Sequence, residues 1–220
     1  MEAAASRNFL VIDDAFGEAV NACIPSGYVG FTLSEGITDF LRIETGALVK
    51  QNLAGYYLEL PASIFDYNHE TSRYLTLQVP LRIQLRQPIV RDRFSLFTTV
   101  GYHYSFNLEG SGTRGGRGTI GDMSGGYLVT SESVSSRVPD TGFSLLEAGM
   151  GCILKFPYDG ELYITSSYFA GFKEMVHTEF TYTLGNDPVR EATASDMGEY
   201  WCLSVGYRHP FRLGGEPVRY

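Results

Sequence analysis

Seven charged or titratable side chains occupy the polar faces of segments with β-strand periodicity. They are Arg42, Glu44, Arg82, Arg86, His103, Glu147 and Arg208. Residues two positions apart in a strand point to the same face. Guanidinium and carboxylate groups confined to one interior form paired, hydrogen-bonded networks. We therefore interpret this set as a structural ion network, with conduction of an ion or a small solute as the alternative.

Two of these residues, together with a nearby serine, also suggest catalysis. His103, Ser105 and Glu147 contain the members of a nucleophile–base–orienter set. However, His103 and Ser105 are alternate positions of a single strand, and no sharp turn presents the serine. The four histidines include no pair with metal-ligand spacing. We expect a chain that is not an enzyme, with no catalytic, cofactor-binding or metal site.

Eight segments with strand periodicity must position these side chains, and no segment has the periodicity of an amphipathic helix. The fourth, "RYLTLQVPLRIQLR", alternates strictly between apolar and polar residues. The first segment alternates least clearly. The expected strands span residues 7–22, 27–35, 39–51, 73–86, 92–107, 142–156, 160–173 and 198–211.

The connections between these segments alternate in length. Those at 35–38, 87–92 and 157–160 are short, whereas those at 52–72, 108–141 and 174–197 are long. Short turns at one end and long loops at the other are typical of an up-and-down barrel, and particularly of outer-membrane barrels. The fold class is therefore all-β, and we expect residues 1–220 to form a single eight-stranded antiparallel transmembrane barrel.

The orientation of the two faces of segment 73–86 indicates whether water or lipid surrounds such a barrel. A lipocalin-like soluble barrel places its apolar face inside, whereas a membrane barrel turns it to lipid. The polar faces here carry glycine, Thr, Ser and Gln, and the chain has three lysines against fourteen arginines. This composition favours a crowded interior over a wetted exterior. We predict that the following residues face lipid: Leu75, Leu77, Val79, Leu81, Ile83 and Leu85.

Two local features follow from the same pattern. Glu44 and Arg82 lie at similar heights on neighbouring strands, so we expect a salt bridge between them. Pro80 removes a backbone donor in the middle of a strand, so we expect a local bulge there or an unpaired carbonyl opposite.

Bulk properties exclude several classes of protein. The net charge is −8 and no Lys/Arg cluster is dense, which argues against a nucleic-acid partner. No apolar run is long enough for a transmembrane helix.

The chain has an odd number of cysteines, and their spacing is not that of metal ligands. They are Cys23, Cys152 and Cys202, so at least one thiol stays unpaired. The start "MEAAASRNF" lacks the basic and apolar regions of a signal peptide, as an envelope protein does after its leader is removed.

The segments resemble the outer-membrane β-barrel family of Bacteroidetes, the porin-family or PorT-like barrels. The resemblance rests on "ITDFLRIETGALVKQ", "YLTLQVPLRIQLRQP", "FSLFTTVGYHYSF", "ELYITSSYFAGF" and "LSVGYRHPF", in that order, over residues 37–211. It implies a location in the cell outer membrane, with the lipid bilayer as partner. It implies little about activity, because one fold serves many functions.

The expected role is structural or accessory, as a component or docking partner of a secretion or uptake complex in the cell envelope. Other envelope proteins would contact the loops 52–72, 108–141 and 174–197. We interpret the Gly/Ser-rich stretch 108–127 as a flexible loop, because it lacks the ending of a phosphate-binding loop. The alternatives are a barrel enzyme acting on lipid or peptide at the outer rim, and a soluble lipocalin-like binder.

Overall fold

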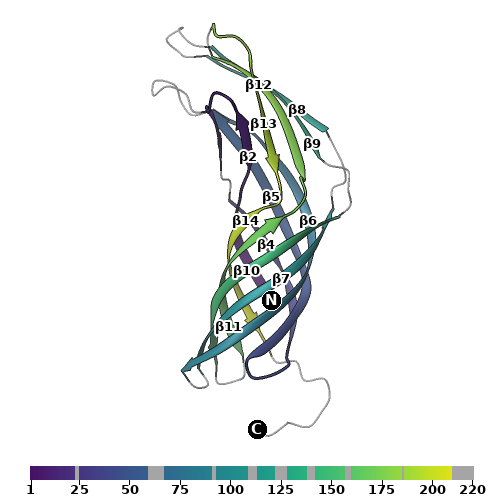
Figure 1. Cartoon of the computed structure of the whole chain (residues 1–220), viewed down its shortest axis with the longest axis vertical. Coiled ribbons are helices and arrows are strands. Elements are labelled where there is room, and N and C mark those ends of the chain that lie inside the picture. Colours follow the sequence, from purple (N-terminus) through teal and green to yellow (C-terminus); the bar gives the residue numbers. More distant parts are fainter. Residues whose placement is uncertain are drawn as a thin grey trace.

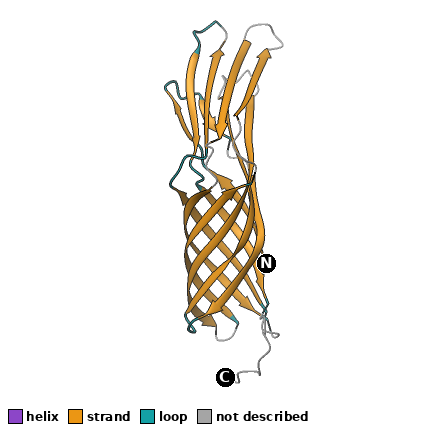
Figure 2. Cartoon of the chain, turned by 90° about the vertical axis from the view of Figure 1, so that its right-hand side faces the viewer, coloured by secondary structure: helices purple, strands orange, loops and turns teal. Residues whose placement is uncertain are grey.

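Eight antiparallel strands close into a barrel in the computed structural model of the chain (Figures 1 and 2). The structure describes residues 1–22, 25–58, 67–90, 93–108, 113–121, 128–137, 142–156, 160–184 and 186–209. No helix occurs among them. The barrel strands are β1 (Glu2–Asn8), β4 (Pro25–Gly36), β5 (Leu41–Leu58), β6 (Tyr67–Val90), β7 (Phe94–Asn107), β10 (Gly142–Lys155), β11 (Glu161–Gly171) and β14 (Tyr200–Arg208).

Each barrel strand pairs with two neighbours. The order β5-β4-β1-β14-β11-β10-β7-β6 is closed by pairing of β5 with β6, so the barrel has no free edge. All of these pairs are antiparallel. The closed eight-stranded all-β fold expected from the alternating segments is therefore confirmed.

A second sheet of five strands lies beyond one end of the barrel, in the upper part of Figures 1 and 2. Its order is β2 (Val11–Asp14), β13 (Arg190–Asp196), β12 (Val176–Leu184), β9 (Leu128–Arg137) and β8 (Thr113–Gly121). The short strand β3 (Ala19–Asn21) pairs with the far end of β5. We call this sheet together with β3 the cap.

The cap corrects the interpretation of the long connections as loops. The connections 108–141 and 174–197 contain the hairpins β8–β9 and β12–β13. Much of 52–72 is strand as well, because β5 and β6 run for 18 and 24 residues and continue past the barrel. These segments were read as loops because of their length, although Val176, Thr178, Phe180 and Tyr182 do alternate as buried positions.

The first barrel strand also differs from the prediction. Its range was expected at 7–22, whereas β1 spans Glu2–Asn8. The outward positions of β1 are the small Ala3 and Ala5 and the polar Arg7, so its apolar alternation is weak. The more hydrophobic stretch that follows contributes β2 to the cap instead.

No bulge marks Pro80. The register of β6 against β7 runs unbroken past the Pro80–His103 pair, and shifts only between Pro88 and Val90. On the β5 side the register is also kept, although the paired positions skip from Leu81 to Gln78. The missing donor therefore interrupts the pairing with β5 without adding a residue. Of the two expected consequences the bulge is wrong, whereas the gap in the ladder at residues 46–47 is in line with an unpaired carbonyl opposite Pro80.

Candidate functional site

Arg82 occupies the centre of the barrel interior and joins three other strands. Its Nη1 lies 2.9 Å from Glu44 Oε1 on β5 and 2.8 Å from Glu2 Oε2 on β1. Its Nε lies 2.6 Å from Glu147 Oε2 on β10. The salt bridge expected between Glu44 and Arg82 is thus present, between residues directly opposite each other in the register. All four side chains are buried, so this is an interior ion network.

Neutral groups add hydrogen bonds to two of the three carboxylates, Glu2 and Glu147. Tyr28 donates to Glu2 at 2.6 Å, and Ser167 donates to Glu147 at 2.8 Å. His103 Nε2 lies 2.7 Å from Glu147 Oε2. Because buried carboxylates are costly unless charges and hydrogen bonds compensate them, these contacts stabilise the network.

A second cluster lies nearer the short-turn end of the barrel. Glu161 on β11 is approached by Arg42 Nη1 at 2.6 Å, Arg86 Nη1 at 3.1 Å and Arg208 Nη1 at 3.7 Å. Arg208 also donates to Glu44 at 2.6 Å and so connects the two clusters.

The structure therefore brings all seven residues singled out in the sequence into one connected network. Sequence reasoning missed Glu2, because the first strand was misplaced, and Glu161, because it begins its strand at the rim. Four arginines face four glutamates in the two clusters, so their formal charges balance.

Aromatic side chains fill the interior between this network and the cap. Phe169 and Tyr200 stack with their ring centroids 4.2 Å apart, and Lys50 Nζ lies 4.0 Å from the Tyr200 ring centroid. Lys50 also donates to Asn8 at 2.9 Å and to Asn52. An eight-stranded barrel is just wide enough for side chains to fill it. These side chains occupy the described interior between the ion network and the cap.

The cap has its own hydrophobic core above this aromatic layer. The Tyr56 and Phe180 rings stack with centroids 4.0 Å apart, joining the extension of β5 to β12. Leu58, Tyr182 and Ala194 belong to the same buried cluster. The cap is thus packed onto the extension of β5 past the rim.

Asp14 fixes the corner between β2 and β3 in the cap. Its carboxylate accepts hydrogen bonds from the backbone N–H of Ala19 at 2.8 Å, of Glu18 at 2.9 Å and of Phe16 at 3.1 Å. The Tyr182 hydroxyl donates to it at 2.9 Å. Burial alone would raise the pKa of Asp14, but these donors, Ala19 first, hold the pKa below the ordinary 3.8.

Acidification is therefore expected to open this corner. A carboxyl whose folded-state pKa is depressed stabilises the fold above its unfolded pKa, and that contribution is lost as the pH falls through the folded value. Cleavage at residues 14–19 by an acid protease should rise between pH values of about 5 and about 3. Asp14→Asn should remove this pH dependence, whereas Asp13→Asn, at the exposed neighbouring carboxylate, should keep it. Equal pH dependence in wild type and Asp14→Asn would contradict this role.

The outer surface of the barrel is apolar. The outward side chains on β6 include Leu81, Ile83 and Leu85, which are 56%, 50% and 57% exposed. Leu75 and Leu77, nearer the cap, are half-buried, and Val79 is exposed. Polar atoms on this surface pair with each other: Trp201 Nε1 donates to Ser166 at 3.1 Å, and the Tyr102 and Ser144 hydroxyls lie 2.6 Å apart.

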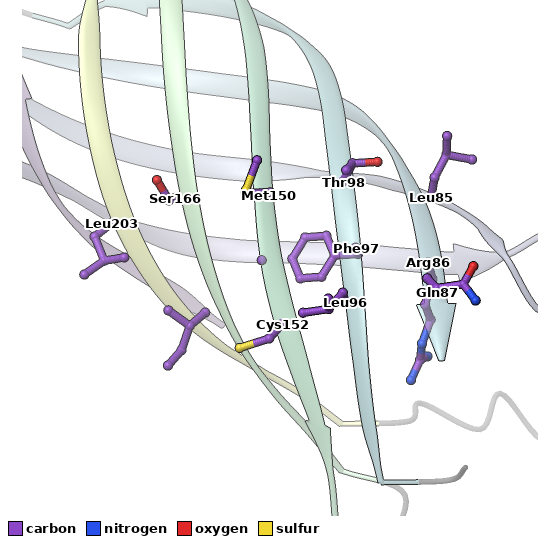
Figure 3. A pocket seen from close by; sticks show the side chains of 12 residues that line it. Leu85, Arg86, Gln87, Leu96, Phe97, Thr98, Met150, Cys152, Ser166 and Leu203 are labelled. Carbon is purple, nitrogen blue, oxygen red and sulfur yellow. The ribbon is translucent and has the colours of Figure 1, made fainter. Parts of the chain in front are cut away.

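A shallow groove of about 600 Å³ crosses the outer wall over β7, β10 and β11 (Figure 3). Gly151 lies in the wall beneath the groove, and a Cβ atom there would lie 2.7 Å from the Phe97 ring inside the barrel. The neighbouring outward residues Thr98, Cys152 and Ser166 are small, whereas Met150 and Leu203 are larger. The groove opens away from the barrel interior and meets the ion network at Arg86, which lines it and pairs with Glu161.

Two sets of residues with nucleophile-like types do not have catalytic geometry. His103 and Ser105 are fully buried, and the Ser105 hydroxyl has no hydrogen-bond partner among the described residues. In the cap, Ser195 Oγ lies 3.4 Å from His177 Nδ1. Both groups instead contact Glu174, whose pKa is lowered by the hydrogen bonds from Ser195 and His177. A serine nucleophile needs a closer hydrogen bond to its base.

The parts of the chain that the structure describes include neither a metal-binding cluster nor a membrane-spanning helix. These parts contain no group of three or more His, Cys, Asp or Glu side chains arranged to hold a metal ion. They also contain no helix with the length and apolar character needed to cross a membrane. Cys152 and Cys202 are free thiols, and Cys23 lies outside the described residues.

Comparison with known proteins gives no family assignment, since neither a protein-family model nor a curated protein matches the chain.

Proposed function

We propose that the chain is an integral outer-membrane β-barrel protein without enzymatic activity. The proposal rests on the distribution of side chains in the barrel, which is the reverse of that in a soluble protein. Charged side chains are buried inside, and Leu, Ile, Val, Phe and Met side chains cover the outside. Water disfavours an apolar surface of this extent on a soluble monomer. A bilayer removes that cost, and its lack of water accounts for the paired hydroxyl and indole groups on the outer surface.

The dimensions of the apolar surface fit a bilayer. On β7 the outward residues run from Leu96 to Phe106, about ten residue steps, which at a tilt of about 40° corresponds to about 25 Å. Aromatic residues gather at both ends of this band. Tyr102, Tyr104, Tyr168 and Trp201 lie towards the cap, and Phe156 and Tyr207 lie towards the short turns. Amphipathic rings prefer the interface between lipid and water.

The cap supports an accessory role. It projects beyond the apolar band (Figure 2), where it would present folded strands outside the membrane. Its exposed carboxylates, which include Asp13, Glu179 and Glu191, offer a surface for a partner within a secretion or uptake complex of the envelope. Family membership in the PorT-like barrels remains a proposal that rests on the order of sequence segments alone.

A lipocalin-like binder is the competing function for the same fold. Such a barrel needs an apolar interior around its ligand, whereas this interior contains the Arg82 network and stacked aromatic rings. The polar interior and the apolar exterior therefore favour a membrane protein over a lipocalin-like binder.

Cysteine labelling in lipid vesicles tests the membrane location. In a Cys23→Ser, Cys152→Ser background, Leu81→Cys places a thiol in the apolar band and Glu191→Cys places one on the cap. A charged, membrane-impermeant maleimide should label the cap thiol and leave the band thiol unreacted until the protein is denatured. Equal labelling of both thiols in the folded protein, or recovery of the wild-type chain in solution without detergent, would refute the proposal.

Purification from native membranes tests the accessory role. Neighbours that co-purify with the wild-type chain should be lost from Glu179→Lys/Glu191→Lys, which changes the cap charge. They should be retained by Glu35→Lys, an exposed residue at the short-turn end. Neighbours that are equally abundant with both variants would argue against docking through the cap.

A further inference from the structure

A hollow of about 200 Å³ opens at the short-turn mouth of the barrel. It is lined by the turn residues Gly36, Thr38, Asp39, Phe40 and Leu41, and by the basic side chains of Arg42, Arg86 and Lys155. At about 30 Å³ per water molecule, it has the volume of several waters. Arg42 and Arg86 also pair with Glu161 in the ion network, whereas no salt bridge is found for Lys155 among the described residues.

The turn that forms one wall of the hollow is well ordered by hydrogen bonds. The Thr38 hydroxyl accepts from the backbone N–H of Leu41 at 3.0 Å and of Phe40 at 3.2 Å. The Phe40 carbonyl accepts from the Arg86 N–H at 2.7 Å, which ties the turn to β6. Arg42, Arg86 and Lys155 therefore come from three different strands and converge on a fixed wall.

The basic groups at this mouth exceed what its carboxylates can pair. Glu161 alone is shared among Arg42, Arg86 and Arg208. Arg208 pairs more closely with Glu44, which leaves Arg42 and Arg86 with Glu161. Their two guanidinium groups offer about ten N–H donors, whereas one carboxylate accepts about four hydrogen bonds. Lys155 adds a further positive charge, and Asp39 is the one acidic residue among those lining the described hollow.

We propose that this hollow binds a phosphate-type oxyanion, held by Arg42, Arg86 and Lys155. Planar guanidinium groups match the geometry of phosphate oxygens, and an ammonium group adds charge. Arg86 also lines the lower end of the outer apolar groove, next to Gln87 (Figure 3). The same chemistry can therefore come from free phosphate or from the headgroup of a lipid whose acyl chain lies along the barrel wall.

Calorimetric titration of the full chain, folded in detergent, with inorganic phosphate at low ionic strength tests the site. Saturable binding is expected. Lys155→Gln should weaken it about threefold, as expected for one partly exposed ionic contact. Asp39→Asn should tighten it, because the substitution removes a repelling charge, and a gain in affinity cannot arise from misfolding. Arg7→Gln, an exposed arginine at the opposite end of the barrel, should leave binding unchanged.

The same titration in lipid nanodiscs distinguishes the two sources. If a headgroup is the natural ligand, adding phosphatidylglycerol to phosphatidylcholine nanodiscs should suppress the binding of inorganic phosphate. If free phosphate is the ligand, binding should be equal in both. Absence of saturable phosphate binding in detergent, or unchanged affinity in both Lys155→Gln and Asp39→Asn, would overturn the proposal. The phosphate titration in detergent tests the site even if the proposed outer-membrane location of the protein is wrong.

Discussion

Arg82→Met is expected to destabilise the barrel by about 3–5 kcal/mol, because it leaves buried carboxylates without their cation. Glu2, Glu44 and Glu147 all contact this one guanidinium group, and only Glu44 has a second arginine, Arg208. Urea unfolding in detergent, followed by the heat-dependent change in electrophoretic migration typical of closed barrels, measures the loss.

A second variant separates the ion network from simple loss of packing. Glu147→Gln removes one of the uncompensated charges but keeps the shape of the side chain. Arg82→Met/Glu147→Gln should therefore be less destabilised than the sum of the two single variants, as expected for residues in one network. Arg7→Gln, at an exposed position on β1, should unfold at the wild-type urea concentration. Additive losses would show that Arg82 contributes through packing alone.

The ion network illustrates which contacts strand periodicity can predict. Glu44 and Arg82 could be paired from sequence, because a short turn and two alternating segments determine which residues share a face and a height. Glu2 could not be included, because alanine at the outward positions of β1 gives almost no apolar alternation. Glu161 sits on the polar face of its strand, but its three arginine partners converge only once β5, β6 and β14 are placed around the closed barrel.

The cap shows a different limit of sequence reasoning. Residues 176–182 of β12 alternate over only a few positions. One neighbour of this strand, β9, is distant in sequence, and so is β2, which pairs with the other neighbour, β13. Strand partners of this kind depend on tertiary packing, so a long connection read alone resembles a loop. The stacking of Phe169 on Tyr200 likewise follows from the registers of β10, β11 and β14, which no single segment encodes.

Phe180→Ala is expected to unfold the cap while the barrel stays closed. Phe180 is 2% exposed and stacks on Tyr56, and loss of a buried phenylalanine side chain costs about 3–5 kcal/mol. The cap core is small, so this loss is large relative to its stability. Hydrogen exchange should accelerate across residues 176–196, whereas the heat-dependent electrophoretic migration of the barrel should remain.

The matched control for this variant is Val189→Ala, which removes an apolar side chain that is 66% exposed in the same hairpin. It should leave hydrogen exchange in the cap unchanged. The two sheets have separate buried clusters, one around Tyr200 and Phe169 and one around Phe180 and Tyr56. Among the described residues no strand pairing joins the five-stranded sheet to the barrel sheet, so opening of the cap should stop near the rim. If Phe180→Ala accelerated exchange in barrel strands to the same degree, the cap and the barrel would form one cooperative unit, and the cap could not move independently to engage a partner.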